Sequence, residues 1–388
     1  NVTSYIEKLS FKDHRGLVVE NITSDFTYTK KNILLDGLSM KTPESEMKGR
    51  VELKYNRKDF SDFNNKVVFD VQFDKASIAS NDLNYFYNEF GKNNVFYVDT
   101  HLIGTLNNFT THNLKLVDKN QSEIVGTINF QNLFGKGDQS FYMKGNFDRL
   151  TSSYDRLKAI LPRILGKNLP STLDKLGTVN MIGGVELTQK YINADVYLMS
   201  KLGELESNLS MQNIDVIDNA LYKGNLILND FDLGTLLGKQ EIGRATVNLD
   251  VDGRGFTQKL LNTAIKGEIR KFYYNGYNYQ NITVDGSMKM PYYKGYFNSN
   301  DPNLKMDFDG TIDLSFKAKN YDFKTQIDYA DLYALNLYKK DSISIFKGNI
   351  NFKAAGNSVD DLAGKLQIND VSYQNSKNSY FFDDFEIV

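Results

Sequence analysis

Residues 303–318 alternate between apolar and polar side chains without a single break. Every even position, from Leu304 to Ala318, carries an apolar side chain or glycine, and every odd position carries a polar one. Successive side chains of a β-strand point to opposite faces of a sheet, so this pattern predicts one long strand with an apolar face and a hydrated face. Strands usually run only about 5–6 residues. The apolar side of such a strand needs something to cover it.

Shorter stretches with the same alternation recur along most of the chain, among them KVVFDVQFD, NADVYLMS and RATVNLDVDG. The composition agrees, since 24 Tyr, 26 Phe and 28 Gly accompany only 5 Pro. Segments rich in Gly, Asn and Asp separate the alternating stretches and supply turns. The sharpest hairpin signal is Asn275-Gly276, which predicts a two-residue type I′ turn. The sequence therefore predicts an all-β, antiparallel fold built from repeated hairpins.

Helical patterning is scarce. The segment 146–177 carries an apolar stripe at helical spacing and is interrupted by Pro162 and Pro170. We expect it to form one longer helical insertion that caps or plugs the sheet, lies on a membrane interface or covers an edge. Single short helices or loops are expected at 80–91, 230–238, 256–263 and 329–338.

A degenerate repeat relates residues 247–286 to residues 350–388. Both segments read as a strand, a glycine turn, a short Leu-bearing helix, a strand, a Tyr-rich hairpin and a strand. Repeats that cannot bury an apolar face alone imply an array of stacked units.

The charge balance gives no reason to expect a nucleic-acid partner, because the formal net charge is −2. Cys is absent, which excludes disulfides and thiolate metal sites and leaves the compartment open. No apolar run reaches the roughly 18 residues that a membrane-spanning helix needs. The chain starts with Asn and ends in what reads as mid-strand, so we expect a piece of a longer protein.

No catalytic or metal-binding constellation stands out. His14, His101 and His112 lie apart in the sequence and lack metal-binding spacing, so we expect exposed surface histidines. The segments 250–253 and 307–310 resemble openings of calcium loops, but alternation puts their Asp side chains on a hydrated strand face. We therefore predict no enzyme, no catalytic residue, no cofactor and no metal.

Alternation alone selects candidates for an exposed apolar surface that could hold lipid chains. The competing interpretation is that the same residues form the core of a closed β-sandwich, which alternates too. The candidates are Val247, Leu249, Val251, Ile282, Val284, Met288, Leu304, Met306, Phe308, Ile312, Leu314 and Phe316.

Residues 220–318 resemble the TamB family as found in Bacteroidetes-type bacteria. The resemblance rests on LGTLLGKQEIG, GRGFT, FYYNGYNYQNITVDG and DPNLKMDFDG in that order, and residues 350–388 echo it. The first third, with LSMKTPESEMKGRVELKY, is similar to the wider AsmA-like group to which TamB belongs.

The resemblance implies an elongated, curled antiparallel sheet that forms an open, U-shaped β-groove, as in bridge-like lipid-transfer proteins. It divides the chain into an AsmA-like segment (1–145), the helical insertion (146–177) and TamB-like repeats (178–388). It also implies a periplasmic protein of a Gram-negative bacterium, anchored in the inner membrane by an N-terminal helix outside these residues. Phospholipid and a BamA- or TamA-type outer-membrane barrel protein are the implied partners.

The leading hypothesis is a lipid-conducting protein that bridges the two membranes. An alternative is a scaffold or chaperone for outer-membrane proteins, acting through strand pairing at an open sheet edge. A third is a surface adhesin that binds glycans through exposed Tyr.

Overall fold

The computed structural model describes residues 1–86, 90–134, 141–162, 165–169, 171–214, 216, 219–255, 260–289, 291–314, 319–357, 361 and 363–388. The chain divides into two compact units, Asn1–Lys201 (unit 1) and Leu202–Val388 (unit 2). The helical insertion lies inside unit 1.

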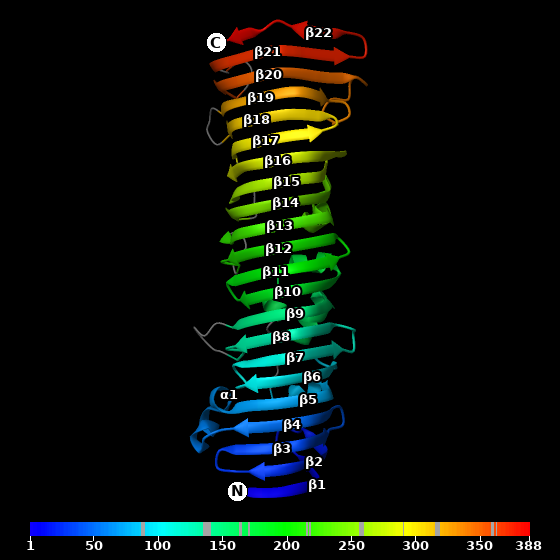
Figure 1. Ribbon diagram of the computed structural model, residues 1–388, viewed down its shortest axis with the longest axis vertical. Coiled ribbons are helices and arrows are strands. Elements are labelled where there is room, and N and C mark those ends of the chain that lie inside the picture. The colour runs from blue at the N-terminus through cyan, green and yellow to red at the C-terminus, as the bar shows by residue number, and fades with distance from the viewer. Residues whose placement is uncertain are drawn as a thin grey trace. The chain divides into compact units, whose positions relative to one another are not determined.

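Unit 1 is an antiparallel sheet in which each strand pairs with the strands before and after it in the chain (Figure 1). Its strands are β1 (Val2–Lys12), β2 (Val18–Tyr28), β3 (Asn32–Lys41), β4 (Glu46–Lys54), β5 (Val68–Ala79), β6 (Val95–Gly104), β7 (Phe109–Asp118), β8 (Glu123–Gln131), β9 (Tyr142–Ser153), β10 (Thr178–Thr188) and β11 (Tyr191–Ser200).

Unit 2 repeats this arrangement of sequential antiparallel neighbours as far as β22, while its last strand, β23, pairs with β21. Its strands are β12 (Gly203–Gln212), β13 (Leu221–Asp232), β14 (Ile242–Arg254), β15 (Asn262–Tyr274), β16 (Tyr277–Lys289), β17 (Tyr292–Asp301), β18 (Leu304–Asp313), β19 (Asn320–Asp331), β20 (Ser344–Ala355), β21 (Ala363–Asn375), β22 (Ser379–Phe382) and β23 (Phe385–Ile387). The predicted all-β, antiparallel fold of repeated hairpins is thereby confirmed in each unit.

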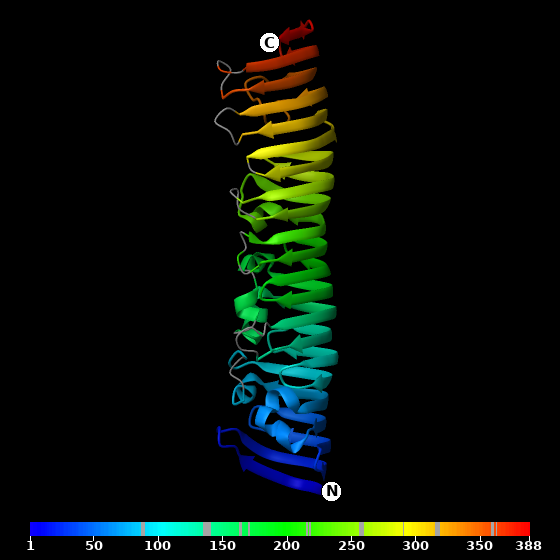
Figure 2. The same cartoon turned by 90° about the vertical axis from the view of Figure 1, so that its left-hand side faces the viewer.

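The helices are short and lie in connections between strands. They are η1 (Arg57–Asp62), α1 (Phe63–Lys66), α2 (Ser80–Leu83), α3 (Tyr154–Ile160), α4 (Leu165–Asn168) and η2 (Ser171–Leu176) in unit 1, and α5 (Leu233–Leu237) in unit 2. In Figure 2, the strands of each unit curve along one side, while helices and longer loops lie on the other. Among the described residues, no helix has the length and apolarity needed to cross a membrane.

The helical insertion begins at Tyr154, so its predicted start at residue 146 is wrong. Residues 146–153 belong to β9. The register shifts within β9, so that Phe147 lies opposite Gly126 and Leu150 opposite Ile124. The shift puts two apolar residues three positions apart on one face of a strand, and that spacing imitates a helix.

A line of β-bulges bends the strands of each unit. Residues with φ between 43° and 54° lie at or beside interruptions of the pairing ladder. Such bulges bend a strand and increase its twist, and Gly, Asn and Asp tolerate the left-handed conformation best. These residues are Gly37, Lys75 and Asn113 in unit 1 and Asp230 and Asp370 in unit 2. In unit 1 they lie on the alternate strands β3, β5 and β7, and such bulges curl each sheet into an open trough.

The apolar side chains of unit 1 gather on one face near this bulge line. One buried cluster consists of Leu17, Val19, Ile22 and Leu38, and partly buried neighbours pack against it. A second consists of Leu114, Ile128, Phe147 and Leu150. The clusters lie where the curled strands bring side chains of the same face closest together.

A buried carboxylate ties two hairpins of unit 2 together. Asn275 and Gly276 both have positive φ between paired Tyr274 and Tyr277, which confirms the predicted two-residue turn. The Tyr277 hydroxyl then donates to Asp301 Oδ1 at 2.5 Å. The same carboxylate accepts the backbone N–H of Gln280 at 2.7 Å. Asp301 is fully buried, so these bonds offset its loss of hydration.

We predict that Tyr277→Phe destabilises unit 2 by about 1–3 kcal/mol, because it removes one of the two donors to a buried carboxylate oxygen and leaves Oδ1 of Asp301 with the backbone N–H of Asn303 alone. Urea unfolding at neutral pH measures the change. Tyr274→Phe is the matched control, since Tyr274 is exposed at the same turn. Equal stabilities of the two variants would contradict the proposed role of Asp301.

The hydrogen bond between Tyr277 and Asp301 also predicts that the stability of unit 2 decreases at alkaline pH. Burial, followed by the hydrogen bond to Asp301, raises the pKa of Tyr277 to about 12, above the value of about 10 in an unfolded chain. The stability it contributes is therefore complete below pH 10 and is lost as the pH rises towards 12. Urea unfolding of parent and Tyr277→Phe across this range should show their difference shrinking. A constant difference would contradict the linkage.

Candidate functional site

The predicted groove residues of unit 2 meet side by side because the strands are in register. Residues directly opposite one another in an antiparallel pair lie on the same face. Val247 pairs with Ile269, which pairs with Ile282 on the next strand. We call the row that runs through them the groove floor. It comprises Leu205, Leu228, Val247, Ile269, Ile282, Ser299, Met306 and Ile327.

Three further rows on the same face form what we call the groove wall. The first comprises Leu226, Leu249, Gly267, Val284, Phe297, Phe308, Thr325 and Ile350. The second comprises Val251, Ile265, Gly286, Gly295, Gly310, Phe323 and Phe352. The third comprises Tyr222, Gly253, Thr263, Met288, Tyr293, Ile312, Tyr321 and Ala354.

Three predicted candidates lie elsewhere. Leu304 is on the same face but beyond the floor, opposite Ala330. Leu314 follows the last residue of β18, and its backbone N–H donates to Pro291 O at 3.0 Å. Phe316 lies outside the described residues. The long predicted strand thus ends at Asp313, and residues 315–318 are outside the described part of the chain.

Most of the apolar face is open to solvent. Val247 and Ile282 on the floor are buried, at 8% and 5% exposure. The other described candidates are partly exposed. The core of a closed sandwich would bury its inward side chains, as protein interiors do. The alternative of a closed sandwich core therefore does not describe this face of unit 2.

No charged residue occurs among the floor and wall positions named above. The hydroxyl groups of Ser299 and Thr325 are bonded to the main chain. Ser299 Oγ donates to Leu304 O, and Thr325 Oγ1 donates to Asp307 O, both at 2.8 Å. A side-chain hydroxyl that has a backbone partner is less available to a ligand. The surface is therefore suited to a ligand without hydrogen-bonding groups.

Aromatic rings concentrate at one part of the wall. The ring centroids of Phe308 and Phe323 are 5.3 Å apart, and those of Phe323 and Phe352 are 5.5 Å apart. Tyr321 joins them, 5.5 Å from Phe352. A hollow of about 1070 Å³ lies beside this cluster. Its lining includes Tyr321, Phe352 and Leu366 and also the charged residues Asp322, Lys353 and Lys365. Aromatic surface of this kind contributes strongly to apolar binding.

Three glycines lie abreast in the wall. Gly295 pairs with Gly286 on one side and with Gly310 on the other. A Cβ on Gly310 would lie 2.4 Å from Phe323 Cα, and its φ is +156°. Glycine at this position therefore allows the strands to approach closely and leaves a stretch of bare backbone between the aromatic rings.

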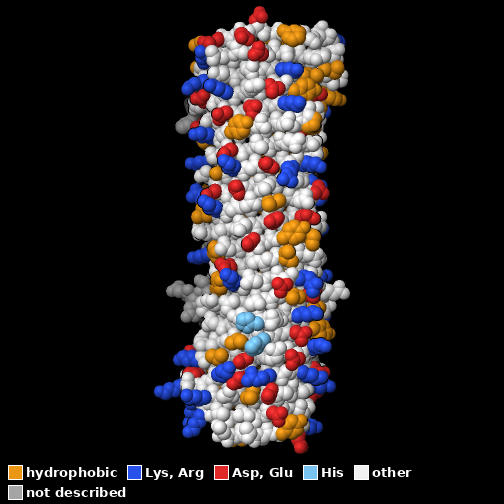
Figure 3. Space-filling model, viewed as in Figure 1, with side chains coloured by type: hydrophobic (Ala, Val, Ile, Leu, Met, Phe, Trp, Pro, Cys, Tyr) orange, Lys and Arg blue, Asp and Glu red, His pale blue; other side chains and the backbone are white. Residues whose placement is uncertain are grey.

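The opposite face of the sheet is hydrated and charged. Figure 3 shows Lys, Arg, Asp and Glu side chains interspersed over the outer faces of the strands. Lys266 and Asp285 form an ion pair of 2.8 Å, as do Lys223 and Asp252. Asp252 and Asp309 are exposed on this face. The described residues hold no cluster of three or more side chains that could bind a metal ion.

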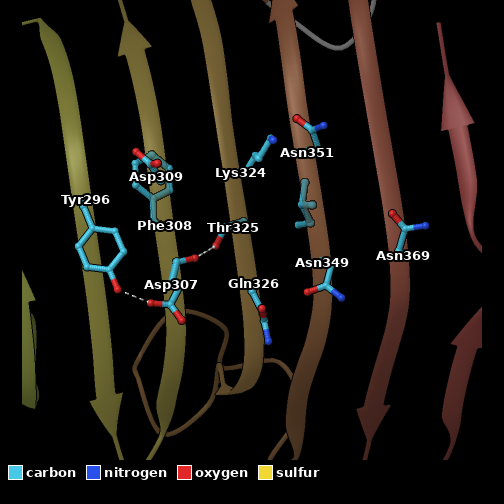
Figure 4. Close-up of a pocket in the computed structure, with 11 residues that line it drawn as sticks. Tyr296, Asp307, Phe308, Asp309, Lys324, Thr325, Gln326, Asn349, Asn351 and Asn369 are labelled. Atoms are coloured by element: carbon cyan, nitrogen blue, oxygen red, sulfur yellow. Dashed lines mark hydrogen bonds between the residues drawn. The ribbon is translucent and has the colours of Figure 1, made fainter.

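A polar hollow of about 300 Å³ lies on this outer face (Figure 4). The Tyr296 hydroxyl donates to Asp307 Oδ1 at 2.7 Å, and Asn298 Nδ2 donates to the same oxygen at 2.7 Å. These two bonds hold the pKa of the Asp307 carboxyl below its usual range. The polar side chains here form hydrogen bonds across neighbouring strands, as expected on a solvent-exposed sheet face.

Two of the three histidines are not apart, contrary to the sequence-based expectation. The turn at 105–108 folds β7 back on β6 and places His101 directly opposite His112. Their ring centroids are 6.2 Å apart. Sequence separation hid this pair, because it depends on the register of the hairpin. His14 lies beside Asp13 in the connection between β1 and β2.

Comparisons with known proteins identify no relative. No family model, no curated protein and no solved structure matches this chain.

We predict that Gly310→Ala destabilises unit 2 by about 1–3 kcal/mol, because the strained φ and the clash with Phe323 act together. Thermal or urea unfolding measures the loss, with Thr311→Ala on the next residue as control. Full stability of Gly310→Ala would show that close strand approach is not required here.

Proposed function

We propose that this chain is a lipid-binding conduit, in which the apolar face of unit 2 holds the acyl chains of phospholipids. The observation that carries this proposal is the uncharged floor and wall, partly exposed at most wall positions and continuous across β13–β20 through direct cross-strand pairing. Large exposed apolar surfaces on folded proteins mark binding sites.

Acyl chains suit this surface better than other apolar ligands. They bring no hydrogen-bonding group, and the hydroxyls of Ser299 and Thr325 are already bonded to the main chain. Each methylene removed from water contributes about 0.8 kcal/mol. Since no fixed polar contact sets a register, a chain can slide from row to row. The headgroup would stay at the mouth of the trough, in contact with water.

We further propose that the protein bridges the inner and outer membranes of a Gram-negative bacterium as a TamB-type, AsmA-like protein without a catalytic step. Support for this part comes from the order of motifs between 220 and 318. A periplasmic location, an inner-membrane anchor outside these residues and a BamA- or TamA-type outer-membrane partner follow from that resemblance alone.

Site-specific photo-cross-linking tests the groove. A photoreactive amino acid at position 284 should capture phospholipid in a cell envelope, because Val284 lies on the wall. The same residue at position 285 should not, because Asp285 lies on the outer face and pairs with Lys266. Mass spectrometry of the cross-linked product identifies the adduct.

The second part of the cross-linking experiment introduces a negative charge into the groove wall. Phe308→Asp should remove the lipid adduct at position 284, whereas Thr311→Asp, with the same new charge on the other face of β18, should leave it. Circular dichroism checks that both variants fold. Equal adduct yields at positions 284 and 285, or no effect of Phe308→Asp in a folded chain, would refute the proposal.

A further inference from the structure

We propose that His101 and His112 form a cross-strand chelate for a divalent transition-metal ion of the Zn²⁺ class on the outer face of unit 1. The proposal does not depend on lipid binding, since these residues lie on the hydrated face of another part of the chain.

The two imidazoles are close enough to share one ion. His101 on β6 and His112 on β7 are direct register partners, with ring centroids 6.2 Å apart and ring planes inclined by 49°. With Zn–N distances of about 2.0–2.1 Å, two imidazoles on one ion place their centroids on the order of 5–6 Å apart. A small rotation of the exposed His112 ring is sufficient. Figure 3 shows two histidine side chains, in pale blue, side by side at the surface.

A carboxylate already orients one of the rings. His101 Nε2 lies 2.8 Å from Asp70 Oδ1. Lys54 Nζ donates to the other oxygen of this carboxylate, Oδ2. With Nε2–H donating to Oδ1, Nδ1 of His101 keeps a free electron pair. Metal-binding histidines characteristically donate their other N–H to such a carboxylate, which fixes the ring and its tautomer.

The neighbouring charges indicate a modest affinity. Lys54 Nζ lies 3.0 Å from Asp70 Oδ2, and Arg50 Nη1 lies 3.8 Å from Oδ1, so the carboxylate is largely balanced by cations. The site offers two imidazoles, with water to complete the coordination. Imidazole ligands favour Zn²⁺, Cu²⁺ and Ni²⁺ over Mg²⁺ or Ca²⁺. Bound metal would join β6 to β7 beside the bulge at Asn113.

Titration with Zn²⁺, followed by nitrogen-15 NMR of the histidine rings, tests the proposal on the whole chain. The ring nitrogens of His101 and His112 should shift together and saturate at one ion per chain, with the largest change at Nδ1 of His101. His14 serves as the internal reference, since its exposed ring has no histidine opposite it and should not follow the same curve.

Variants identify the ligands. His112→Gln should weaken Zn²⁺ binding at least about tenfold without unfolding the chain, because His112 is exposed. His14→Gln should leave binding unchanged. Asp70→Asn should keep both rings but weaken binding about tenfold and alter the tautomer of His101. The proposal would be overturned if the NMR signals of His101 and His112 responded to added Zn²⁺ at different concentrations. It would also be overturned if His112→Gln bound Zn²⁺ as tightly as the parent chain.

Discussion

Direct cross-strand pairing of apolar side chains on one face of a single curled sheet is the constraint on which the rest of this structure depends. The antiparallel register places apolar residues opposite one another. Val247, Ile269 and Ile282 therefore form one continuous apolar surface across three strands. A one-residue slip would move each of them to the hydrated face. The bulges beside this row curl the sheet around it, and the floor residues gain burial from the bend. Most wall residues, farther from the bend, stay partly exposed, whereas Tyr222, Thr263 and Thr325 are buried.

Most strands and their apolar faces could be predicted from the sequence, because apolar residues at every second position specify both the strand and the face on which they lie. The turn at Asn275-Gly276 could be predicted equally well, since few residues accept positive φ at two consecutive positions. The positions of the bulges could not be predicted from the sequence. Asn113 and Asp230 differ in no way from other Asn and Asp residues until the pairing partner is known. The same effect explains the misplaced start of the helical insertion, where the bulge in β9 spaces Phe147 and Leu150 like residues of a helix.

The candidate site was predictable in part for a related reason. Alternation selects Leu249, Val284 and Phe308, but only register shows that they form one row. The glycines at 286, 295 and 310 read as turn or spacing residues in isolation, and their alignment becomes visible only across strands. The pair of His101 and His112 has no sequence signature at all. Its existence depends on how far the β6–β7 hairpin extends past its turn.

The two faces of unit 2 thus carry different chemistry from the same alternating pattern. The floor and wall carry no charged residue, while the outer face pairs acids with bases. The central claim is that the first face takes up lipid chains. Native mass spectrometry of the purified chain, followed by lipid extraction, tests it most directly. We predict bound phospholipid that organic solvent releases. A well-folded chain that carries no lipid, even after incubation with phospholipid vesicles, would contradict the claim.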